Sequence, residues 1–313
     1  MAVKYAGVDI SRWQTNVDYE ALAKATIKGK PVKFAIIRAA AGTSEDSLFK
    51  KHVEGCLKAG LNVGVYVYSY ATTVDEAKAE AEFVISLIKK YNLDGKLTYP
   101  IVYDLEEAST ATLSKKKYGG KLCTDMTKAF CETIESYNYY PMIYTNFDWL
   151  FWSKHIDYDQ LKKWPFWVAG YIAESRAKPY MDKITVWQHS VAGNNQFDIA
   201  GIGSVQGVPG QCDCNWAYVG LAAQIKKLGK NKFKKTAAKK TTYTLTAKAE
   251  NQPAAKRAQL EGVLKANGIA NVSKTISAYN IGGKTTGLTA SQFNAKAKIL
   301  RANGFKVSAT KET

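Results

Sequence analysis

The chain has 313 residues, of which 46% are hydrophobic, and it carries a formal net charge of +17. This composition excludes a wholly disordered chain, and no apolar run reaches the ~18 residues that a membrane span needs. The length fits two domains, or one α/β barrel of about 200–250 residues with a small appendage.

Strands and amphipathic helices alternate along the first part of the chain. The expected strands are 5–10, 34–41, 62–70, 97–105, 141–146, 166–171, 184–189 and 212–218, and the expected helices are 19–27, 47–59, 74–90 and 123–137. After residue 147 the helical pattern weakens. The alternation predicts a parallel sheet wrapped in helices, and eight candidate strands favour a small, irregular barrel over an open sheet. No glycine-rich fingerprint follows the first strand, which disfavours dinucleotide binding.

The positive charge lies in the C-terminal part of the chain. Residues 225–313 hold 19 Lys and Arg against three acids, and the rest of the chain is almost neutral. Residues 225–242 contain eight Lys and no acid, so we expect a linker there. A cationic tail on a neutral body is typical of adhesion to a polyanion such as nucleic acid, anionic lipid or an anionic cell wall.

The segment after this linker has the pattern of a second, small domain. We expect strands at 243–249, 272–279 and 305–309, helices at 253–266 and 290–302, and a glycine turn at 281–287. Two β-α-β halves predict a ferredoxin-like sandwich. The segment has no cluster of catalytic groups, which indicates a binding domain.

The N-terminus and the cysteines indicate the cellular compartment in which the chain is made. MAVKYAGVDIS lacks the apolar stretch of a secretion signal, so we expect synthesis in the cytoplasm without a signal peptide. Five cysteines without a CxxC pair fit reduced thiols better than a disulfide framework. Cys212 and Cys214 flank Asp213, and in a strand the two thiols share one face.

Four acids are expected to meet at one mouth of the barrel. Asp104 and Glu106 end an apolar strand at positions i and i+2, Asp9 ends the first strand, and Asp213 lies in the last strand, which neighbours the first when a barrel closes. Like charges at close range cannot all ionise freely, so at least one acid should have a raised pKa and act as an acid near neutral pH. Glu107 is expected to point away from the pair.

Other interpretations of these acids are open. Any one of them could be a helix cap or a solvated loop residue, and several together could hold Mg²⁺ or Ca²⁺. Only three His are present, none in a ligand-like motif, so we expect no metal and no cofactor. Aromatic residues near the expected mouth favour a sugar substrate over phosphoryl transfer. They are Trp13, Tyr66, Tyr68, Tyr70, Tyr144, Trp167, Tyr171 and Trp187.

Seven short segments resemble the family 25 glycoside hydrolases, muramidases of the Chalaropsis type that occur in many phage endolysins and bacterial autolysins. The segments are GVDISRWQ, GVYVYSYA, PIVYDLEE, MIYTN, FWVAGY, VWQHS and CDCNW, in this order from residue 7 to residue 216. The resemblance implies an irregular (β/α)5β3 barrel over residues 1–224. It also implies cleavage of the β-1,4 bond between N-acetylmuramic acid and N-acetylglucosamine in peptidoglycan.

The resemblance also implies roles for individual residues. Glu106 is then the general acid, and Asp104 either stabilises the oxocarbenium charge, orients the N-acetyl group of the substrate or positions water. Asp9 and Asp213 tune pKa values and hold substrate or water. The expected substrate-binding residues are Trp13, Arg38, Tyr66, Tyr144, Tyr171, Trp187 and Gln188, although the family often has Lys where Arg38 stands.

The C-terminal segment, 243–313, is similar in length and element order to the sporulation-related repeat, which implies a cell-wall-binding domain. Its charge favours anionic wall polymers as additional partners. One alternative is a non-catalytic glycan-binding protein built on an inactive barrel. A nucleic-acid-binding tail is the other, and the scarcity of aromatic residues after 225 disfavours it.

Overall fold

The computed structural model describes residues 2–106, 120–234, 243–250, 254–269, 273–275 and 280–312. The chain divides into two compact units, Met1–Thr236 and Ala237–Thr313, and each is described by itself. Among the described residues no helix is long and apolar enough to cross a bilayer.

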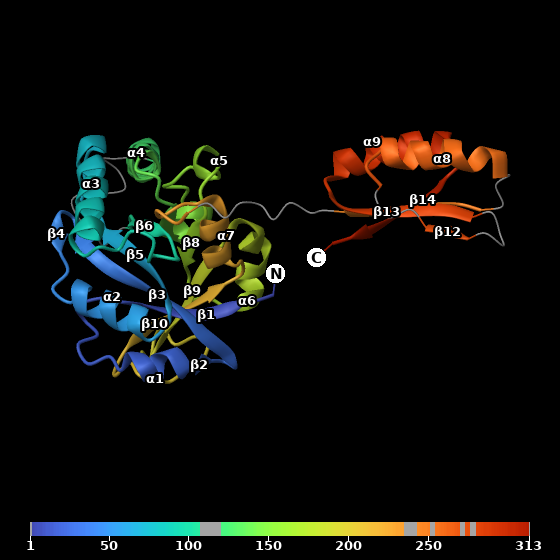
Figure 1. Ribbon diagram of the computed structural model, residues 1–313. Helices are drawn as coiled ribbons and strands as arrows, with labels where there is room; N and C mark the ends of the chain where they lie inside the picture. The colour runs from blue at the N-terminus through green and yellow to red at the C-terminus, as the bar shows by residue number, and fades with distance from the viewer. Residues whose placement is uncertain are drawn as a thin grey trace. The chain divides into compact units, whose positions relative to one another are not determined.

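Eight strands close a barrel in the first unit (Figure 1). They are β1 (Tyr5–Ile10), β3 (Lys30–Ala41), β5 (Asn62–Tyr68), β6 (Ile101–Asp104), β7 (Pro141–Asn146), β8 (Phe166–Ala169), β9 (Val186–Ala192) and β10 (Cys212–Ala217). Neighbouring strands from β1 to β9 are parallel, whereas β10 runs antiparallel to both β9 and β1. Two-residue strands β2 (Thr26–Ile27) and β4 (Ser44–Glu45) pair with β3. The predicted irregular barrel is therefore confirmed.

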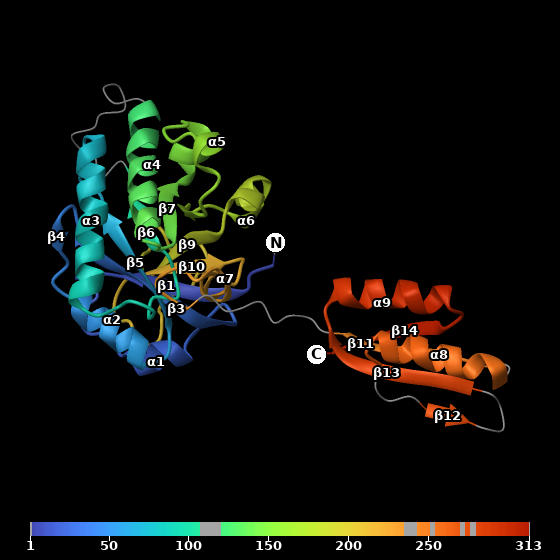
Figure 2. The same cartoon turned by 45° about the horizontal axis from the view of Figure 1, so that its top comes forward.

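Helices cover the outside of the first half of this barrel (Figure 2). They are α1 (Tyr19–Lys24), α2 (Phe49–Lys58), α3 (Val74–Lys90) and α4 (Gly120–Ser136). After β7 the helical elements are short: η1 (Asp148–Trp152), α5 (Tyr158–Leu161), α6 (Glu174–Ala177) and η2 (Lys178–Lys183). The weak helical pattern after residue 147 corresponds to this change.

Large side chains fill the barrel interior below its mouth, among them Phe34, Tyr99, Val102 and Met142. Two small residues make room for them. A Cβ atom at Gly7 would lie 2.4 Å from the Phe34 ring, and one at Gly64 would lie 2.8 Å from Cβ of Tyr99. The interior is thus a packed core and not a pore, as is usual for barrels of this size.

The predicted linker, 225–242, is wrong in its first part. Helix α7 (Leu221–Leu228) continues beyond residue 225, and Ile225 is fully buried. Asn231 is also buried; its Nδ2 donates to the carbonyls of Leu97 and Tyr99 at 2.8 and 3.0 Å. These contacts fasten the chain to the barrel as far as Asn231, despite its lysine-rich composition. Residues 235–242 lie outside the described residues.

The second unit is a four-stranded antiparallel sheet with both helices on one face (Figure 1). Its elements are β11 (Tyr243–Ala249), α8 (Ala254–Ala266), β12 (Ser273–Thr275), β13 (Asn280–Leu288), α9 (Ala290–Ala302) and β14 (Lys306–Lys311). The strand order β12-β13-β11-β14 is that of the expected ferredoxin-like sandwich. The predicted glycine turn at 281–287 is wrong, because these residues lie in β13. A Cβ atom at Gly282 would come within 2.8 Å of the Ala247 carbonyl oxygen, so glycine here permits close strand pairing.

Candidate active site

The four predicted acids lie together at one end of the barrel. Asp9 and Asp104 lie near the C-terminal ends of β1 and β6, and Glu106 follows two residues later. Asp213 lies near the start of β10. Because β10 is antiparallel, its start lies at the same mouth, and Asp213 is paired directly with Asp9. Glu107 lies outside the described residues.

These acids share a cavity of about 240 Å³ with most of the predicted substrate-binding residues. The predicted residues that line it are Asp9, Trp13, Arg38, Tyr66, Asp104, Glu106, Tyr144, Tyr171, Gln188 and Asp213. Tyr68 and Trp167, two of the aromatic residues that the sequence places near the mouth, also line it. Ile10, Ser11 and Gln14, which sequence reasoning missed, line it as well.

Trp187 lies away from this cavity. Its side chain is 2% exposed, and its indole N–H donates to the Gly170 carbonyl at 2.9 Å. Successive side chains of a strand point to opposite faces, so Trp187 and its neighbour Gln188 cannot both face the interior. Gln188 faces inward, and Trp187 packs in the outer core, 5.8 Å from the ring of Trp216. The expectation that both line the groove is therefore not met.

Two amides hold Asp9. Gln188 Nε2 donates to Asp9 Oδ2 at 3.0 Å, and Asn215 Nδ2 donates to the same oxygen at 2.7 Å. The orientation of each amide is fixed by hydrogen bonds that its side-chain oxygen accepts. Gln188 Oε1 accepts from the hydroxyls of Tyr144 and Tyr171, both at 2.9 Å. Asn215 Oδ1 accepts from the indole N–H of Trp167 at 2.7 Å. Asn215 was not predicted, although its position two residues after Asp213 places it on the same strand face.

Burial raises the pKa values of all four acids. It raises the pKa of Glu106 to about 7, with the charge of Asp9 as a further cause. It raises the pKa of Asp9 to about 6, although the hydrogen bonds from Asn215 and Gln188 oppose this rise. Burial raises the pKa values of Asp104 and Asp213 well above the usual range, and repulsion by the neighbouring carboxylates adds to it. The cluster therefore retains protons near neutral pH and contains a group that can donate one, as the sequence predicts.

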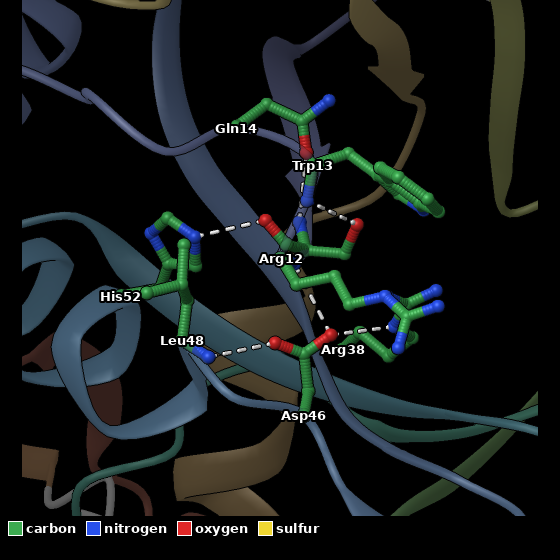
Figure 3. Close-up of polar contacts among 8 residues, drawn as sticks. Arg12, Trp13, Gln14, Arg38, Asp46, Leu48 and His52 are labelled. Carbon is green, nitrogen blue, oxygen red and sulfur yellow. Dashed lines mark hydrogen bonds and ion pairs between the residues drawn. The ribbon is translucent and has the colours of Figure 1, made fainter.

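Arg38 is held at the cavity wall by a residue that the sequence did not single out. Its Nε donates to Oδ2 of Asp46 at 2.7 Å, and the Asp46 side chain has no exposed surface (Figure 3). Arg38 thus brings a positive charge to a cavity that four acids and several aromatic residues also line. No local sequence pattern marks Asp46, because its contact with Arg38 forms only where the chain turns back after β3 and β4 pairs with that strand.

Exposed aromatic rings flank the cavity. Trp13 is 70% exposed, and the guanidinium of Arg12 lies 4.9 Å from the centre of its ring (Figure 3). Tyr70 is 57% exposed and makes an edge contact with Tyr68, with 5.5 Å between ring centres. Flat aromatic faces next to buried acids suit a ligand with both apolar faces and hydroxyl groups, such as a glycan chain.

Comparisons with known proteins agree with this geometry. The family described as glycosyl hydrolases family 25 matches residues 8–197. The uncharacterized protein YegX of Escherichia coli K12 is 26% identical over 213 residues, which cover 67% of this chain and 68% of YegX. The autolytic lysozyme of Clostridium acetobutylicum is 27% identical over 209 residues, 66% of this chain and 54% of that protein.

Solved structures share the barrel fold. The modular autolysin LytC from Streptococcus pneumoniae superposes with a TM-score of 0.55 and 23% identity, over 68% of this chain and 46% of LytC. A bacterial lysozyme from Streptomyces coelicolor gives a TM-score of 0.54 and 22% identity, over 75% of this chain and all of that lysozyme. The chain thus spans about half the length of the clostridial and pneumococcal proteins that it matches.

Proposed function

The chain belongs to family 25 of the glycosyl hydrolases, and from this membership we propose that its barrel is a lysozyme-type N-acetylmuramidase. The proposed reaction is cleavage of the β-1,4 bond between N-acetylmuramic acid and N-acetylglucosamine in the peptidoglycan of bacterial cell walls. The observation that carries this proposal is the buried group of four carboxylates in a cavity flanked by aromatic rings. The autolytic activity named for the clostridial relative and the LytC structure with a synthetic peptidoglycan ligand both support it.

In the proposed reaction Glu106 is the general acid. Departure of the sugar oxygen requires a proton, and a carboxyl group whose pKa lies near the working pH is protonated often enough to donate it. Burial raises the pKa of Glu106 to about 7, which meets this requirement. Glu106 lies at the mouth, where the polymer can reach it.

Asp104 is the second carboxyl group of the proposed reaction. It stabilises the oxocarbenium charge, orients the N-acetyl group of the substrate or positions water. Asp9 and Asp213 tune the pKa values of Asp104 and Glu106 and hold substrate or water. Five residues that line the cavity contact the sugar, namely Trp13, Tyr66, Tyr144, Tyr171 and Gln188.

The test is mass spectrometry of the soluble fragments released from Gram-positive cell walls. Wild type should release fragments with N-acetylmuramic acid at the new reducing end, and Glu106→Gln should release at least 100-fold less, since general acid catalysis typically contributes about 10²–10⁴-fold. Glu82→Gln removes a carboxylate from the exposed surface of α3 and serves as the control. Reducing ends at N-acetylglucosamine would refute the bond assignment. No fragments from several wall types would favour a non-catalytic glycan-binding barrel.

We also propose that the second unit binds the cell wall, with anionic wall polymers contributing to its affinity. Support comes from its separate hydrophobic core and from its exposed cations on several elements, among them Lys248, Lys284, Lys298 and Lys306. The full chain should sediment with walls more strongly than a chain ending at residue 236, and added salt should weaken the difference. Equal retention of both chains by walls, or retention of the full chain by DNA alone, would refute this assignment.

A further inference from the structure

We propose that a pocket beside the acid cluster is a further sugar subsite, that it takes an N-acetylglucosamine ring of the same glycan strand, and that Glu80 positions its aromatic platform, Tyr70. The inference rests on the proposed function for its choice of ligand, because it concerns how the barrel holds a glycan polymer beyond the bond that it cleaves. The pocket is separate from the cavity of the acids and has a volume of about 560 Å³.

Three segments form this pocket. They are residues 41–44 at the turn from β3 to β4, Tyr70 and Ala71 after β5, and Glu76, Ala79 and Glu80 in the first half of α3. Strand β4 lies beside α3 in both views of the fold (Figures 1 and 2). The pocket is therefore built from the ends of two neighbouring barrel strands and from the helix that covers them.

Tyr70 connects this pocket to the cavity of the acids. Its ring makes an edge contact with the ring of Tyr68, with 5.5 Å between ring centres, and Tyr68 lines that cavity. More than half of the Tyr70 side chain is exposed, so a ligand can reach its ring. A glycan strand bound at the acids has further rings to place on the surface next to them. The two tyrosines give such a strand an aromatic path from the cavity to the pocket.

The turn after β3 holds the Tyr70 ring closely. A Cβ atom at Gly42 would lie 3.2 Å from Cδ2 of Tyr70, so a larger residue would crowd the ring. Gly42 has a φ of +57°, a left-handed conformation that favours glycine. Its backbone N–H donates to the Tyr68 carbonyl at 2.8 Å. Glycine at this position thus lets the turn pack against the strand end that carries both tyrosines.

Glu80 fixes the backbone at Tyr70. The Glu80 side chain is 3% exposed; its Oε1 accepts from the backbone N–H of Tyr70 at 2.8 Å, and its Oε2 accepts from Oγ of Ser69 at 2.7 Å. Oγ of Ser69 also accepts from the backbone N–H of Ala71 at 3.1 Å and lies 2.9 Å from the hydroxyl oxygen of Tyr103. One buried carboxylate therefore holds the turn that carries the platform.

The same turn is joined to the strand that delivers Asp104. The backbone N–H of Ser69 donates to the Asp104 carbonyl at 2.9 Å. Adjacent rings of one strand can occupy the cavity and the pocket together only if the two sites keep a fixed separation. The contacts of Ser69 with both Glu80 and Asp104 meet this requirement, because they place the platform and the acid cluster in one hydrogen-bonded frame.

The charge of the pocket favours a neutral sugar. No described residue that lines it carries a positive charge, and its two acids, Glu76 and Glu80, both accept hydrogen bonds from backbone N–H groups. A carboxylate or phosphate group of a wall polymer would be repelled there. Thr43 and Ser44 bring hydroxyl groups, and alanine methyl groups bring apolar surface. Together with an aromatic face, these groups suit N-acetylglucosamine, which has hydroxyl groups and a methyl group but no charge.

The test is fluorine-19 NMR of the full chain labelled with 3-fluorotyrosine, with the β-1,4-linked hexamer of N-acetylglucosamine as the probe. Glu106→Gln is the parent, so that the probe is not cleaved. The signals of Tyr70 and Tyr144 are identified by their loss in Tyr70→Phe and Tyr144→Phe. The hexamer should shift both signals with one dissociation constant, because one strand occupies both sites. A Tyr70 signal that the hexamer does not shift would overturn the inference.

The contribution of the platform is measured by affinity. Tyr70→Ala should weaken binding of the hexamer by about 3–10-fold, a loss typical of one aromatic contact. The affinity is read at the Tyr144 signal, so sugar bound by the second unit does not enter it. Tyr137→Ala removes another exposed ring, outside the pocket, and is the matched control. Equal affinities of Tyr70→Ala and the parent would overturn the subsite.

The part played by Glu80 is tested through the same affinity. Glu80→Ala should weaken binding as much as Tyr70→Ala does and should add nothing to it, whereas Glu80→Gln keeps an oxygen acceptor for the Tyr70 N–H and should bind like the parent. Ser69→Ala is a milder variant for the case that Glu80→Ala does not fold, and it should weaken binding in the same direction. Lower Tm with unchanged affinity, or losses that add in the double variant, would overturn the positioning role.

These readouts separate the inference from the proposed function, because none of them requires cleavage. Wild type that releases no wall fragments, together with a hexamer that shifts both signals, would refute the muramidase and support the subsite. Wild type that cleaves peptidoglycan, together with Tyr70→Ala that binds like the parent, would support the muramidase and overturn the subsite.

Discussion

Replacing the proposed general acid, Glu106→Gln, should stabilise the folded protein while it abolishes cleavage. Burial raises the pKa of this carboxyl from 4.5 to about 7, so ionising it costs more in the folded than in the unfolded chain. A folded-state pKa above the unfolded value contributes stability that is complete below about pH 4.5 and is lost as the pH rises through about 7. Glutamine cannot ionise, so the variant escapes this loss.

The size of the gain follows from the shift. Each pKa unit corresponds to about 1.4 kcal/mol, so a rise of this size gives an upper bound of about 3 kcal/mol. Glu106 is partly exposed and interacts with the other acids, which lowers the expected gain to about 1–3 kcal/mol at pH 8. For a domain of this size, 1 kcal/mol raises Tm by about 2–4 °C.

Thermal unfolding at pH 5 and pH 8 checks this reasoning. Glu106→Gln should melt above wild type at pH 8, and most of the difference should disappear at pH 5. Glu82→Gln, on the exposed surface of α3, should melt with the wild type at both values. A variant that is no more stable than wild type at pH 8, or whose gain is equally large at pH 5, would show that Glu106 is not destabilised by its surroundings.

Three further substitutions test the framework around the site. Asn215→Leu removes one of the two amide donors to Asp9 and should lower the free energy of unfolding by about 1–3 kcal/mol in a denaturant titration; an unchanged midpoint would contradict this. Burial lowers the pKa of His189 to about 4, so its stability contribution is present above pH 6.5 and is lost as the pH falls through 4. His189→Phe should therefore flatten the decline in Tm between these values, and an unchanged decline would show that His189 does not cause it. Gly7→Ala places a methyl group against the Phe34 ring and should cost about 1–3 kcal/mol, whereas Gly60→Ala, where no atom lies within 4 Å, should show only the cost of its positive φ.

Sequence reasoning identified the acids because their positions follow from local pattern. Asp9 and Asp104 end apolar strands, and strand ends of a barrel meet at one mouth. The alternation of side chains also determines which neighbour faces inward, and it could have separated Gln188 from Trp187. Asp213 reaches the mouth for a reason that the sequence does not contain, namely the antiparallel direction of β10.

Other features depend on contacts between distant segments. Residues 225–234 look like a linker in composition, yet Asn231 is held by carbonyls more than 130 residues away in the chain. Asp46 lies in a short polar stretch that resembles a surface turn, yet its buried carboxylate accepts from Nε of Arg38 and from the backbone N–H groups of Arg12 and Leu48. Composition describes the average surroundings of a segment, so it cannot reveal one buried polar group that joins two elements.

The surroundings of the acids explain why the site needs so many fixed partners. A carboxyl group that donates a proton near neutral pH has to be buried, and burial raises the pKa of every acid that shares the cavity. The pKa of Asp104 stays well above its ordinary value even though the charge of Arg38 opposes the rise. The amides of Asn215 and Gln188 oppose the same rise at Asp9, whose pKa reaches about 6. The protonation of the cluster therefore depends on Asn215, Gln188 and Arg38 as well as on burial, and variants of these residues should change the pH profile of cleavage.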